Sequence, residues 1–441
     1  MLSYTNRLLY RKFNISNITL KYKTHCCKVL VVGGGTAGIS IAARFSKFLC
    51  KNDVIIVEPQ DVHYYQSCFT WIGAGVKTLQ DSVQANLKVF PQNSIWLRDS
   101  VACFCPGDNA IVLESGHFVE YDVMVLALGV KMDFEEIQGL TEALDNYRNV
   151  STIYSPRYVE KTFKSSKEFI SGPALFTSPN TPVKCLSAPL KICYLAEAYL
   201  RKEDKLCEAD FMFATADENL YPVKKYDDLL RKIAKRKRID VHLKTNLIQV
   251  IPEKNQVVLE CLDEPEKKLV CNYSLLHVVP PMSPPQVLQD SKELVDNLGY
   301  ANVDLYTLRH KKFPNVYAAG DCSPGTKNKT TSAISVQTYT IFGNIMKSMT
   351  GKEGKEKYNG YTVCPIITGY GRCVLAEFDY NLKPCSSVPF WHGFESRLLY
   401  WIKRYILPVV YWNLLLKGLW NGTGTLRKIL RLQVFSLRRK N

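Results

Sequence analysis

The chain has 441 residues, of which 46% are hydrophobic, so it is long enough to bury the cores of two or three domains. Its 57 lysines and arginines exceed its 41 acids by 16, but residues 1–28 and 391–441 together carry fifteen of these net charges. A protein that binds nucleic acid needs its cations on the folded domains, so this distribution argues against a nucleic-acid partner.

The first 27 residues have the composition of a mitochondrial transit peptide. They combine basic, hydroxylic and apolar residues, and the first acid of the chain is Asp53. The segment lacks the long apolar core of a secretory signal, and spaced cations without acids are typical of import into mitochondria. A basic disordered tail has the same composition and stays an alternative. We expect residues 1–27 to be a transit peptide.

Residues 28–58 have the pattern of a dinucleotide-binding unit. "KVLVVGGGTAGISIAARF" passes from a buried strand through three glycines into a helix, and the next strand ends at Glu58, twenty residues beyond Gly38. Gly33 allows the tight turn, Gly35 lets the backbone approach a pyrophosphate, and Gly38 lets the helix pack closely on the strand. The Glu58 carboxylate suits ribose hydroxyls and disfavours a 2′-phosphate, which leaves FAD or NAD. A glycine-rich turn in an unrelated α/β domain is the alternative.

Two later strands decide between these cofactors. "YDVMVLALG" (121–129) ends in a turn of small residues, and "FPNVYAAGDC" (313–322) ends in Gly-Asp. In this order the three motifs resemble those of flavoproteins with two dinucleotide-binding domains. The resemblance places Asp321 on the ribityl chain of FAD. It also points the N-terminus of a helix beginning near Thr331 at the flavin, where the positive helix end stabilises the anionic reduced ring. FAD is therefore the expected cofactor.

Residues 151–270 are expected to form a second Rossmann-like domain whose nucleotide fingerprint is missing. Strands and helices alternate from 174 to 251, but the first strand-to-helix loop, "SPNTPVKCLSAP", has three prolines and no glycine. Prolines lack the backbone N–H groups that a pyrophosphate requires. NADH is therefore not the expected electron donor, and Cys185 lies where the pyrophosphate would bind.

Residues 351–441 contain a further cysteine and an amphipathic end. "YTVCPIITGYGRCVLAEF" (361–378) is β-like and carries Cys364. Apolar residues recur at helical spacing in 395–420, and the longest uncharged run there (405–416) is well short of the ~20 residues that span a bilayer. Tryptophans with flanking cations suit helices that lie in a membrane interface. Packing against the protein's own core or a partner subunit is the alternative, and a homodimer is possible.

The cysteines do not form a disulfide framework or a metal centre. There are fifteen, an odd number, scattered along the chain, which favours a reducing compartment and free thiols. No cysteine or histidine has the spacing of metal ligands, so we expect no metal site.

Together these motifs resemble the mitochondrial sulfide:quinone oxidoreductase family. The resemblance covers about residues 28–420 and rests on the glycine-rich turn, "HYYQ", the Cys185 loop, "AAGDC", "YTVCPIITGY", "AEFDY" and "YWNLLLKGLW". It implies an α/β fold with two Rossmann-like dinucleotide-binding domains, of which the FAD domain is discontinuous (28–150 and 271–350). A C-terminal amphipathic region that associates with the membrane would follow, placing the protein on the mitochondrial inner membrane as a peripheral or monotopic enzyme.

The resemblance also implies the chemistry of two cysteines. Cys185 and Cys364 would be bridged by a disulfide or trisulfide, which hydrogen sulfide would attack to leave a persulfide on Cys364. A thiol such as glutathione, or sulfite, would accept the sulfane sulfur, and the electrons would pass through FAD to ubiquinone. Bacterial relatives use a third cysteine near the position of Tyr154, so a two-cysteine mechanism is implied. Lys184 is a candidate for lowering the pKa of the neighbouring Cys185 thiol.

The family's flavin contacts carry over to this chain residue by residue. With the glycines of the turn, the expected cofactor-binding residues are Gly33, Gly35, Thr36, Ala37, Gly38, Glu58, Gln66, Val101, Asp321, Lys329, Thr331, Ser332, Ala333 and Lys403. Two other functions were weighed. A type II NADH:quinone dehydrogenase would need the missing glycine fingerprint, and a redox-inactive flavoprotein scaffold or sensor would not need the two cysteines.

Overall fold

The computed structural model describes residues 23–324, 329–385 and 393–422. Most of the predicted transit peptide therefore lies outside the described residues. Its last residues do not, because strand β1 (Thr24–Val32) begins four positions before the expected start of the FAD domain at residue 28.

The first sheet has seven strands and carries the glycine-rich turn. Its order is β5-β2-β1-β8-β7-β6, with β19 also paired to β8. Strand bounds are β2 (Val54–Val57), β5 (Ile95–Leu97), β6 (Val101–Cys105), β7 (Ala110–Leu113), β8 (Phe118–Leu126) and β19 (Val316–Ala318). β5, β2, β1, β8 and β19 run parallel, whereas β6 and β7 form an antiparallel hairpin at one edge.

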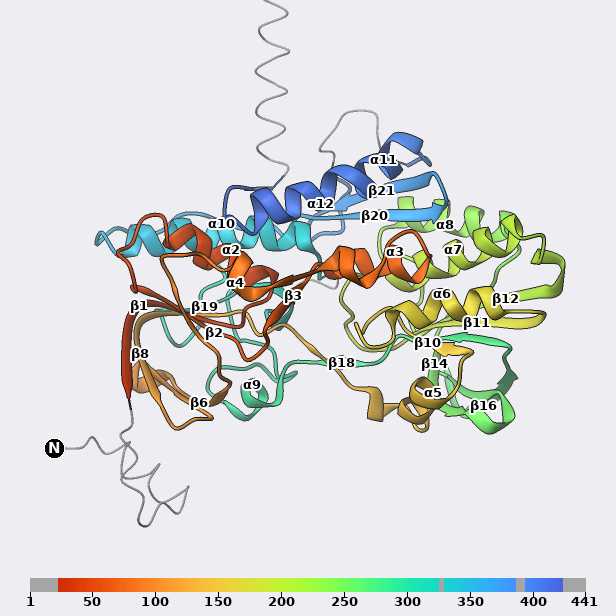
Figure 1. Cartoon of the computed structure of the whole chain (residues 1–441), viewed down its shortest axis with the longest axis horizontal. Helices are drawn as coiled ribbons and strands as arrows, with labels where there is room; N and C mark the ends of the chain where they lie inside the picture. The colour runs from red at the N-terminus through yellow and green to blue at the C-terminus, as the bar shows by residue number, and fades with distance from the viewer. Residues whose placement is uncertain (1–22, 325–328, 386–392, 423–441) are drawn as a thin grey trace, which may run out of the picture.

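Two helices far apart in sequence pack together on one face of this sheet. They are α2 (Thr36–Phe45), which follows the turn, and α10 (Thr331–Ser348), which follows the Gly-Asp motif (Figure 1). The end of β1 is a run of apolar residues that are at most 2% exposed, as expected for a parallel strand covered on both faces. The carboxyl ends of β1 and β19 thus lead into two neighbouring helices, as they must if both motifs serve one ligand.

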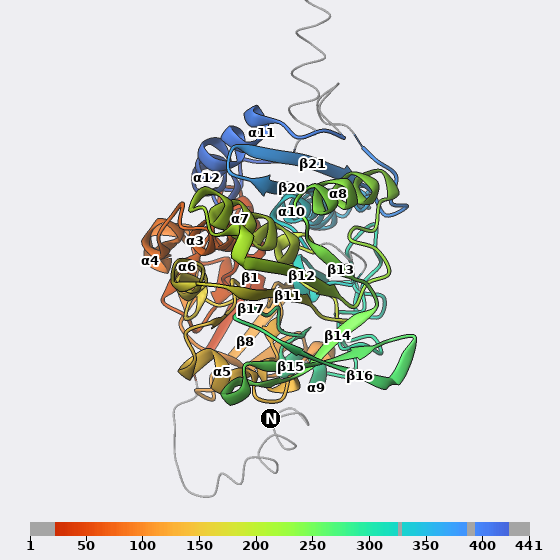
Figure 2. The same ribbon diagram turned by 90° about the vertical axis from the view of Figure 1, so that its right-hand side faces the viewer.

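The second sheet is parallel, with the order β10-β17-β11-β12-β13. Its elements are β10 (Val150–Ser151), β11 (Gly172–Ser178), β12 (Ala209–Thr215), β13 (Asp240–His242), β17 (Leu275–His277), α6 (Val159–Glu168), α7 (Ala188–Lys202) and α8 (Lys224–Arg236). Figure 2 shows α7 and α8 on one side of this sheet and an antiparallel sheet on the other. That sheet consists of β14 (Thr245–Ile251), β15 (Gln256–Cys261) and β16 (Glu264–Asn272).

Two details differ from the sequence expectation. The last stretch of the alternating pattern, residues 240–251, forms two strands, β13 and β14, and not one, because Lys244 has a left-handed backbone with φ of 50°. Strand β17 pairs with β11 in the second sheet, although residues beyond 270 were assigned to the FAD domain. Two crossing segments, β9 (Lys131–Met132) and β18 (Met282–Ser283), pair with each other where the chain passes between the sheets.

The C-terminal region lies across both domains. The hairpin β20 (Thr362–Gly369) and β21 (Arg372–Phe378) packs against α7 and α10. Above it lies one continuous helical stretch rather than two separate helices, formed by α11 (Arg397–Trp401), η8 (Ile402–Ile406), α12 (Leu407–Val410) and η9 (Tyr411–Leu415) (Figure 1). Within the described residues, no helix has the length and apolarity to cross a bilayer.

The remaining elements are short and connect these layers. They are β3 (Val62–Tyr64), η1 (Gln66–Cys68), α3 (Phe69–Gly73), η2 (Leu79–Ser82), β4 (Val83–Ala85), α4 (Asn86–Val89), η3 (Pro106–Asp108), η4 (Phe134–Glu136), α5 (Leu140–Asn146), η5 (Leu206–Glu208), η6 (Pro252–Lys254), α9 (Gln286–Asp290) and η7 (Gly320–Cys322).

Candidate active site

A cavity of about 410 Å³ lies where the two sheets and the C-terminal helix meet. Thirteen of the sixteen predicted site residues line it: Gly33, Gly35, Thr36, Ala37, Glu58, Gln66, Cys185, Asp321, Lys329, Thr331, Ser332, Cys364 and Lys403. Residues separated by as many as 370 positions are therefore brought to one site. Gly38, Val101 and Ala333 are the three that do not line it.

The glycine-rich turn has the close approaches that its sequence predicts. Gly33 has φ of 106°, and a Cβ on it would lie 2.4 Å from the carbonyl oxygen of Ala127. A Cβ on Gly38 would lie 1.8 Å from the carbonyl oxygen of Gly33. Gly38 does not line the cavity, but its missing side chain lets α2 pack closely against β1. A Cβ on Gly35 would meet no atom within 4 Å. The backbone at Gly35 therefore faces open space at the N-terminus of α2, where a pyrophosphate would be favoured.

Other groups around the cavity also fit a dinucleotide. The Glu58 carboxylate is fixed by two backbone N–H groups, those of Gly34 at 2.7 Å and Gln60 at 2.9 Å. Burial raises the pKa of Asp321, while the charges of Lys329 and Lys184 lower it. The Lys329 ammonium donates to the carbonyl oxygen of Asp321 at 2.6 Å and so holds this turn. The open turn, the acid after β2 and the start of α10 together suit a flavin dinucleotide.

Val101 and Ala333 are placed elsewhere. Val101 is buried in β6, and Ala333 is buried in α10 with its backbone N–H bonded to the Thr330 hydroxyl at 3.2 Å. That hydroxyl is the N-cap of α10. Thr331 and Ser332, in the first turn of α10, remain at the cavity.

The sulfur atoms of Cys185 and Cys364 lie 3.8 Å apart. Cys185 comes from the loop before α7 and Cys364 from the buried strand β20. Cys185 has a left-handed backbone with φ of 57°, an uncommon conformation for a residue other than glycine. Two hydrogen bonds hold it there: its N–H donates to the carbonyl oxygen of Lys329 at 2.9 Å, and its carbonyl accepts from the N–H of Ala188 at 2.7 Å. Strain fixed in this way is typical of functional positions.

A buried lysine and a serine contact the two sulfurs unequally. The Lys191 ammonium lies 3.1 Å from the sulfur of Cys185, and the Ser187 hydroxyl lies 2.6 Å from that of Cys364. The hydrogen bond from the Cys364 thiol lowers the pKa of Cys185 well below its usual range, against the effect of burial, and the charges of Lys191 and Lys403 lower it further. The same hydrogen bond and burial raise the pKa of Cys364. Cys185 is therefore the sulfur of the pair that loses its proton more readily.

The lysine that acts on Cys185 is not the one expected from the sequence. The Lys184 ammonium donates to the side-chain oxygen of Gln66 at 2.6 Å, and Lys191 occupies the place beside the sulfur. Lys191 is 2% exposed, and a lone lysine among the apolar residues of α7 was the signal that could have identified it. Lys403 is also buried, donates to the carbonyl oxygen of Pro365 at 3.0 Å, and has its pKa lowered to about 8 by burial and by the charge of Lys191.

Tyr154 lines the same cavity with an unused hydroxyl. The side chain is 5% exposed, and its hydroxyl has no hydrogen-bond partner among the described residues. Burial first, and then the negative charges of Cys185 and Cys364, raise its pKa well above the usual value. A buried hydroxyl without a partner costs stability, so a bound molecule that accepts from it would be favoured.

The C-terminal helix closes the cavity with one face and presents apolar side chains to solvent with the other. The inward residues Leu407, Val410, Tyr411 and Leu415 line the cavity, as does Trp420 beyond the helix. The Tyr411 hydroxyl lies 2.8 Å from that of Thr36 and 2.5 Å from Nε2 of His63, which fastens the helix to the glycine-rich turn. The outward side chains are each at least 40% exposed: Leu398, Trp401, Tyr405, Ile406 and Val409.

Comparisons with known proteins settle the family. No family model matches the chain. It is 42% identical to the mitochondrial sulfide:quinone oxidoreductase of Mus musculus over 413 residues, which are 92% of this chain and 91% of the relative. The chain belongs to the mitochondrial sulfide:quinone oxidoreductases. The Dictyostelium discoideum member is 37% identical over 90% of this chain and 88% of its own.

The fold agrees with this family. The crystal structure of sulfide:quinone oxidoreductase from Aquifex aeolicus superposes with a TM-score of 0.77, covering 90% of this chain and 92% of that one at 17% identity. The predicted family and α/β fold class are therefore confirmed, and the chain is an oxidoreductase whose family and fold imply a flavin cofactor. In the part of the chain that the structure describes, no group of three histidines, cysteines or acids could hold a metal ion.

Proposed function

We propose that this protein oxidises hydrogen sulfide at Cys185 and Cys364, using FAD, and passes the electrons to ubiquinone. The observation that carries the proposal is the pair of sulfurs 3.8 Å apart with the Lys191 ammonium 3.1 Å from one of them. An adjacent cation makes a cysteine both a better thiolate and a better leaving group. Cys185 is thus the sulfur released when the bridge opens.

The bridge is a disulfide or a trisulfide between the two cysteines. Hydrosulfide attacks the sulfur on the Cys364 side of a disulfide, a new S–S bond forms, and the bond to Cys185 breaks with its electron pair left on the Cys185 thiolate. Cys364 then carries a persulfide. Lys191 stabilises the released thiolate, and the Ser187 hydroxyl, 2.6 Å from the sulfur of Cys364, keeps that sulfur in place.

A small acceptor then takes the outer sulfur of the Cys364 persulfide. A thiolate such as that of glutathione, or sulfite, attacks this sulfur and leaves a Cys364 thiolate. The two cysteine thiolates rejoin by losing two electrons. Bound FAD supplies the two-electron chemistry that links this oxidation to ubiquinone. Gly35, Glu58 and Asp321 are the residues proposed to hold it.

The C-terminal helix is the proposed route for the quinone. Its exposed apolar residues, among them Trp401 and Val409, would lie in the interface of the mitochondrial inner membrane. Leu407 and Val410, from the same helix, line the cavity. A quinone in the bilayer would therefore reach the cavity along this helix without crossing water.

NADH oxidation is the competing function. The loop where a second nucleotide would bind has no glycine. The backbone N–H of Cys185 in this loop already donates to the carbonyl oxygen of Lys329. The deciding experiment is an anaerobic titration of the purified protein with sulfide and, separately, with NADH. We expect sulfide to bleach the flavin and NADH to leave it oxidised. Bleaching by NADH but not by sulfide would overturn the proposal, and bleaching by neither would favour the scaffold or sensor.

A pair of variants tests the proposed cysteine chemistry. Cys364→Ser should abolish sulfide-dependent quinone reduction, whereas Cys207→Ser, which removes an exposed cysteine, should leave it unchanged. Full activity in the Cys364→Ser protein would refute the two-cysteine mechanism even if sulfide remained the substrate.

A further inference from the structure

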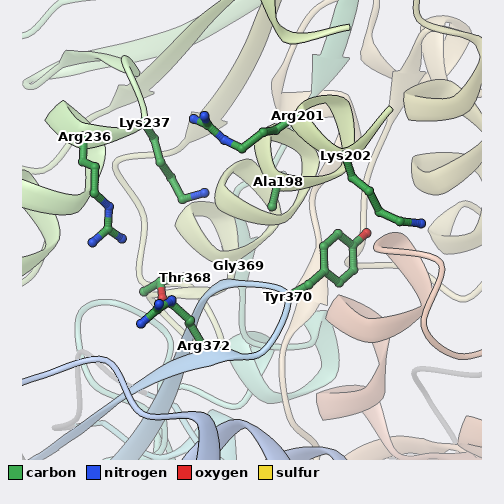
Figure 3. Close-up of a pocket in the computed structure, with 9 residues that line it drawn as sticks. All are labelled: Ala198, Arg201, Lys202, Arg236, Lys237, Thr368, Gly369, Tyr370 and Arg372. Carbon is green, nitrogen blue, oxygen red and sulfur yellow. The ribbon is translucent and has the colours of Figure 1, made fainter. Parts of the chain in front are cut away.

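A second cavity, of about 570 Å³, lies away from the sulfur pair (Figure 3). It is lined by the C-terminal ends of α7 and α8 and by the turn between β20 and β21, and it opens to solvent. Cys185 precedes the opposite end of α7, and Cys364 lies near the start of β20, so this cavity and the active site are at opposite ends of the same two elements.

The lining of this cavity is strongly basic. It includes the five cations Arg201, Lys202, Arg236, Lys237 and Arg372, and none of its lining residues is an aspartate or a glutamate. Figure 3 shows that they come from three separate segments of the chain. Cations are favoured in the last turn of any single helix. That preference does not explain why cations from three segments lie around one cavity.

Nearby carboxylates neutralise only part of this charge. Glu197, which is fully buried behind the wall, is paired with both Lys237 and Arg201. Glu395 is paired with Arg236 at 2.8 Å, and Glu203 is 3.8 Å from Lys202.

Three acids thus face five cations, and among the described residues no acid lies within ion-pair distance of Arg372. The carboxyl ends of α7 and α8 contribute about half a negative charge each, which still leaves a positive excess.

The cavity is held in shape by buried contacts. Lys237 is 8% exposed, and a Cβ on Gly369 would lie 3.7 Å from its ammonium nitrogen, so this cation faces the turn at close range. The turn itself is fixed because the Tyr370 hydroxyl donates to the carbonyl oxygen of Ala74 at 2.8 Å. The Thr368 hydroxyl is bonded to Glu395 at 2.5 Å, which fixes the other side. These contacts hold the lining of the site in one arrangement.

We propose that this second cavity binds a phosphoryl group. Guanidinium groups match the geometry of phosphate oxygens, and a partly buried ammonium adds a point charge. The volume suits a small ligand or a headgroup. Two sources share this chemistry: a free phosphate or pyrophosphate ester, and the headgroup of an anionic phospholipid. The cavity lies close to the proposed membrane face, which favours the phospholipid. Glu395, which pairs with Arg236 of the cavity, lies in sequence between two exposed apolar residues of that face, Phe394 and Leu398.

The test uses the full-length holoprotein and two single variants. Arg372→Gln removes an exposed cation of the cavity, and Arg148→Gln removes an exposed arginine elsewhere. Calorimetric titration with pyrophosphate, in a buffer without phosphate, should show one site that Arg372→Gln weakens about tenfold or more, since bonds to charged groups are strong. Arg148→Gln should match the wild type. Sulfide-dependent flavin bleaching should be the same in all three, so the outcome is independent of the proposed function.

The second arm identifies the source. Co-sedimentation compares vesicles of phosphatidylcholine alone with vesicles that also contain phosphatidylglycerol. If the ligand is a lipid, the wild type should sediment more with the anionic vesicles, and Arg372→Gln should lose that excess. If it is a free ester, only the pyrophosphate affinity should fall. Should Arg372→Gln lose its bound flavin, Lys202→Gln replaces it. The proposal is refuted if neither pyrophosphate nor anionic vesicles distinguish the cavity variant from Arg148→Gln.

Discussion

Replacing Lys191 by methionine should raise the pKa of the Cys185 thiol, because the substitution removes a charged group that favours the thiolate. Methionine keeps the length of the side chain but removes the ammonium that lies 3.1 Å from the Cys185 sulfur. Lys191 is buried and Cys185 is partly buried, so solvent screens the pair only in part. A hydrogen bond to a charged group contributes about 1.5–3 kcal/mol, and this is the stabilisation of the thiolate that the substitution removes. Less of the thiol is then ionised at neutral pH, and Cys185 becomes a poorer leaving group.

The assay is the pH dependence of alkylation of the reduced protein by iodoacetamide, with the modified cysteine identified by mass spectrometry. In the Lys191→Met protein the midpoint for Cys185 should move to higher pH, and sulfide-dependent flavin bleaching should slow. Lys191→Arg restores the charge and should move the midpoint back toward the wild type. An unchanged midpoint in Lys191→Met would refute the assignment of Lys191 as the group that stabilises the thiolate.

Two further predictions concern Tyr154 and the glycine-rich turn. Tyr154→Phe should slow sulfide oxidation about tenfold without lowering the melting temperature of the apoprotein, because the lost hydroxyl has no protein partner. Tyr273→Phe removes another buried hydroxyl without a partner and should not change the rate of sulfide oxidation, so equal rates in the two variants would contradict a role for Tyr154. Gly38→Ala should destabilise the apoprotein by about 1–3 kcal/mol, because its Cβ would strike the backbone of Gly33. Gly35→Ala should melt like the wild type yet retain less flavin on purification, and a normal flavin content would argue against the pyrophosphate position.

The sequence predicts those parts of the site in which the backbone conformation or a close contact allows only one residue type. Gly33 and Gly38 have close contacts that admit no side chain, and such contacts leave a fixed spacing in the sequence. The two cysteines were identified only through the resemblance of their motifs, because nothing in the spacing of Cys185 and Cys364 indicates that they meet. Their 3.8 Å separation results from the packing of α7 against β20.

The features that escaped prediction depend on chain direction and on long-range packing. Lys184 is the nearest cation to Cys185 in sequence, but the left-handed backbone at Cys185 sends the chain into α7 so that Lys191 reaches its sulfur. No side-chain pattern predicts a positive φ at a cysteine. The assignment of β17 failed for a similar reason, since a strand of three residues takes its sheet from its neighbours.

The C-terminal helix has a consequence for the order in which the protein can become active. Its inward face supplies Lys403 and Tyr411 to a cavity whose turn is made from residues near position 35. A chain still being synthesised has the dinucleotide turn early, Cys185 midway and Cys364 later, but it lacks the closing wall, which begins at Lys403, until more than nine tenths of its 441 residues exist. The cavity proposed for the sulfur chemistry is therefore complete only in a nearly finished chain, and the helix that completes it is also the one with the exposed apolar face. Completion of the cavity and completion of the exposed apolar face thus coincide in time.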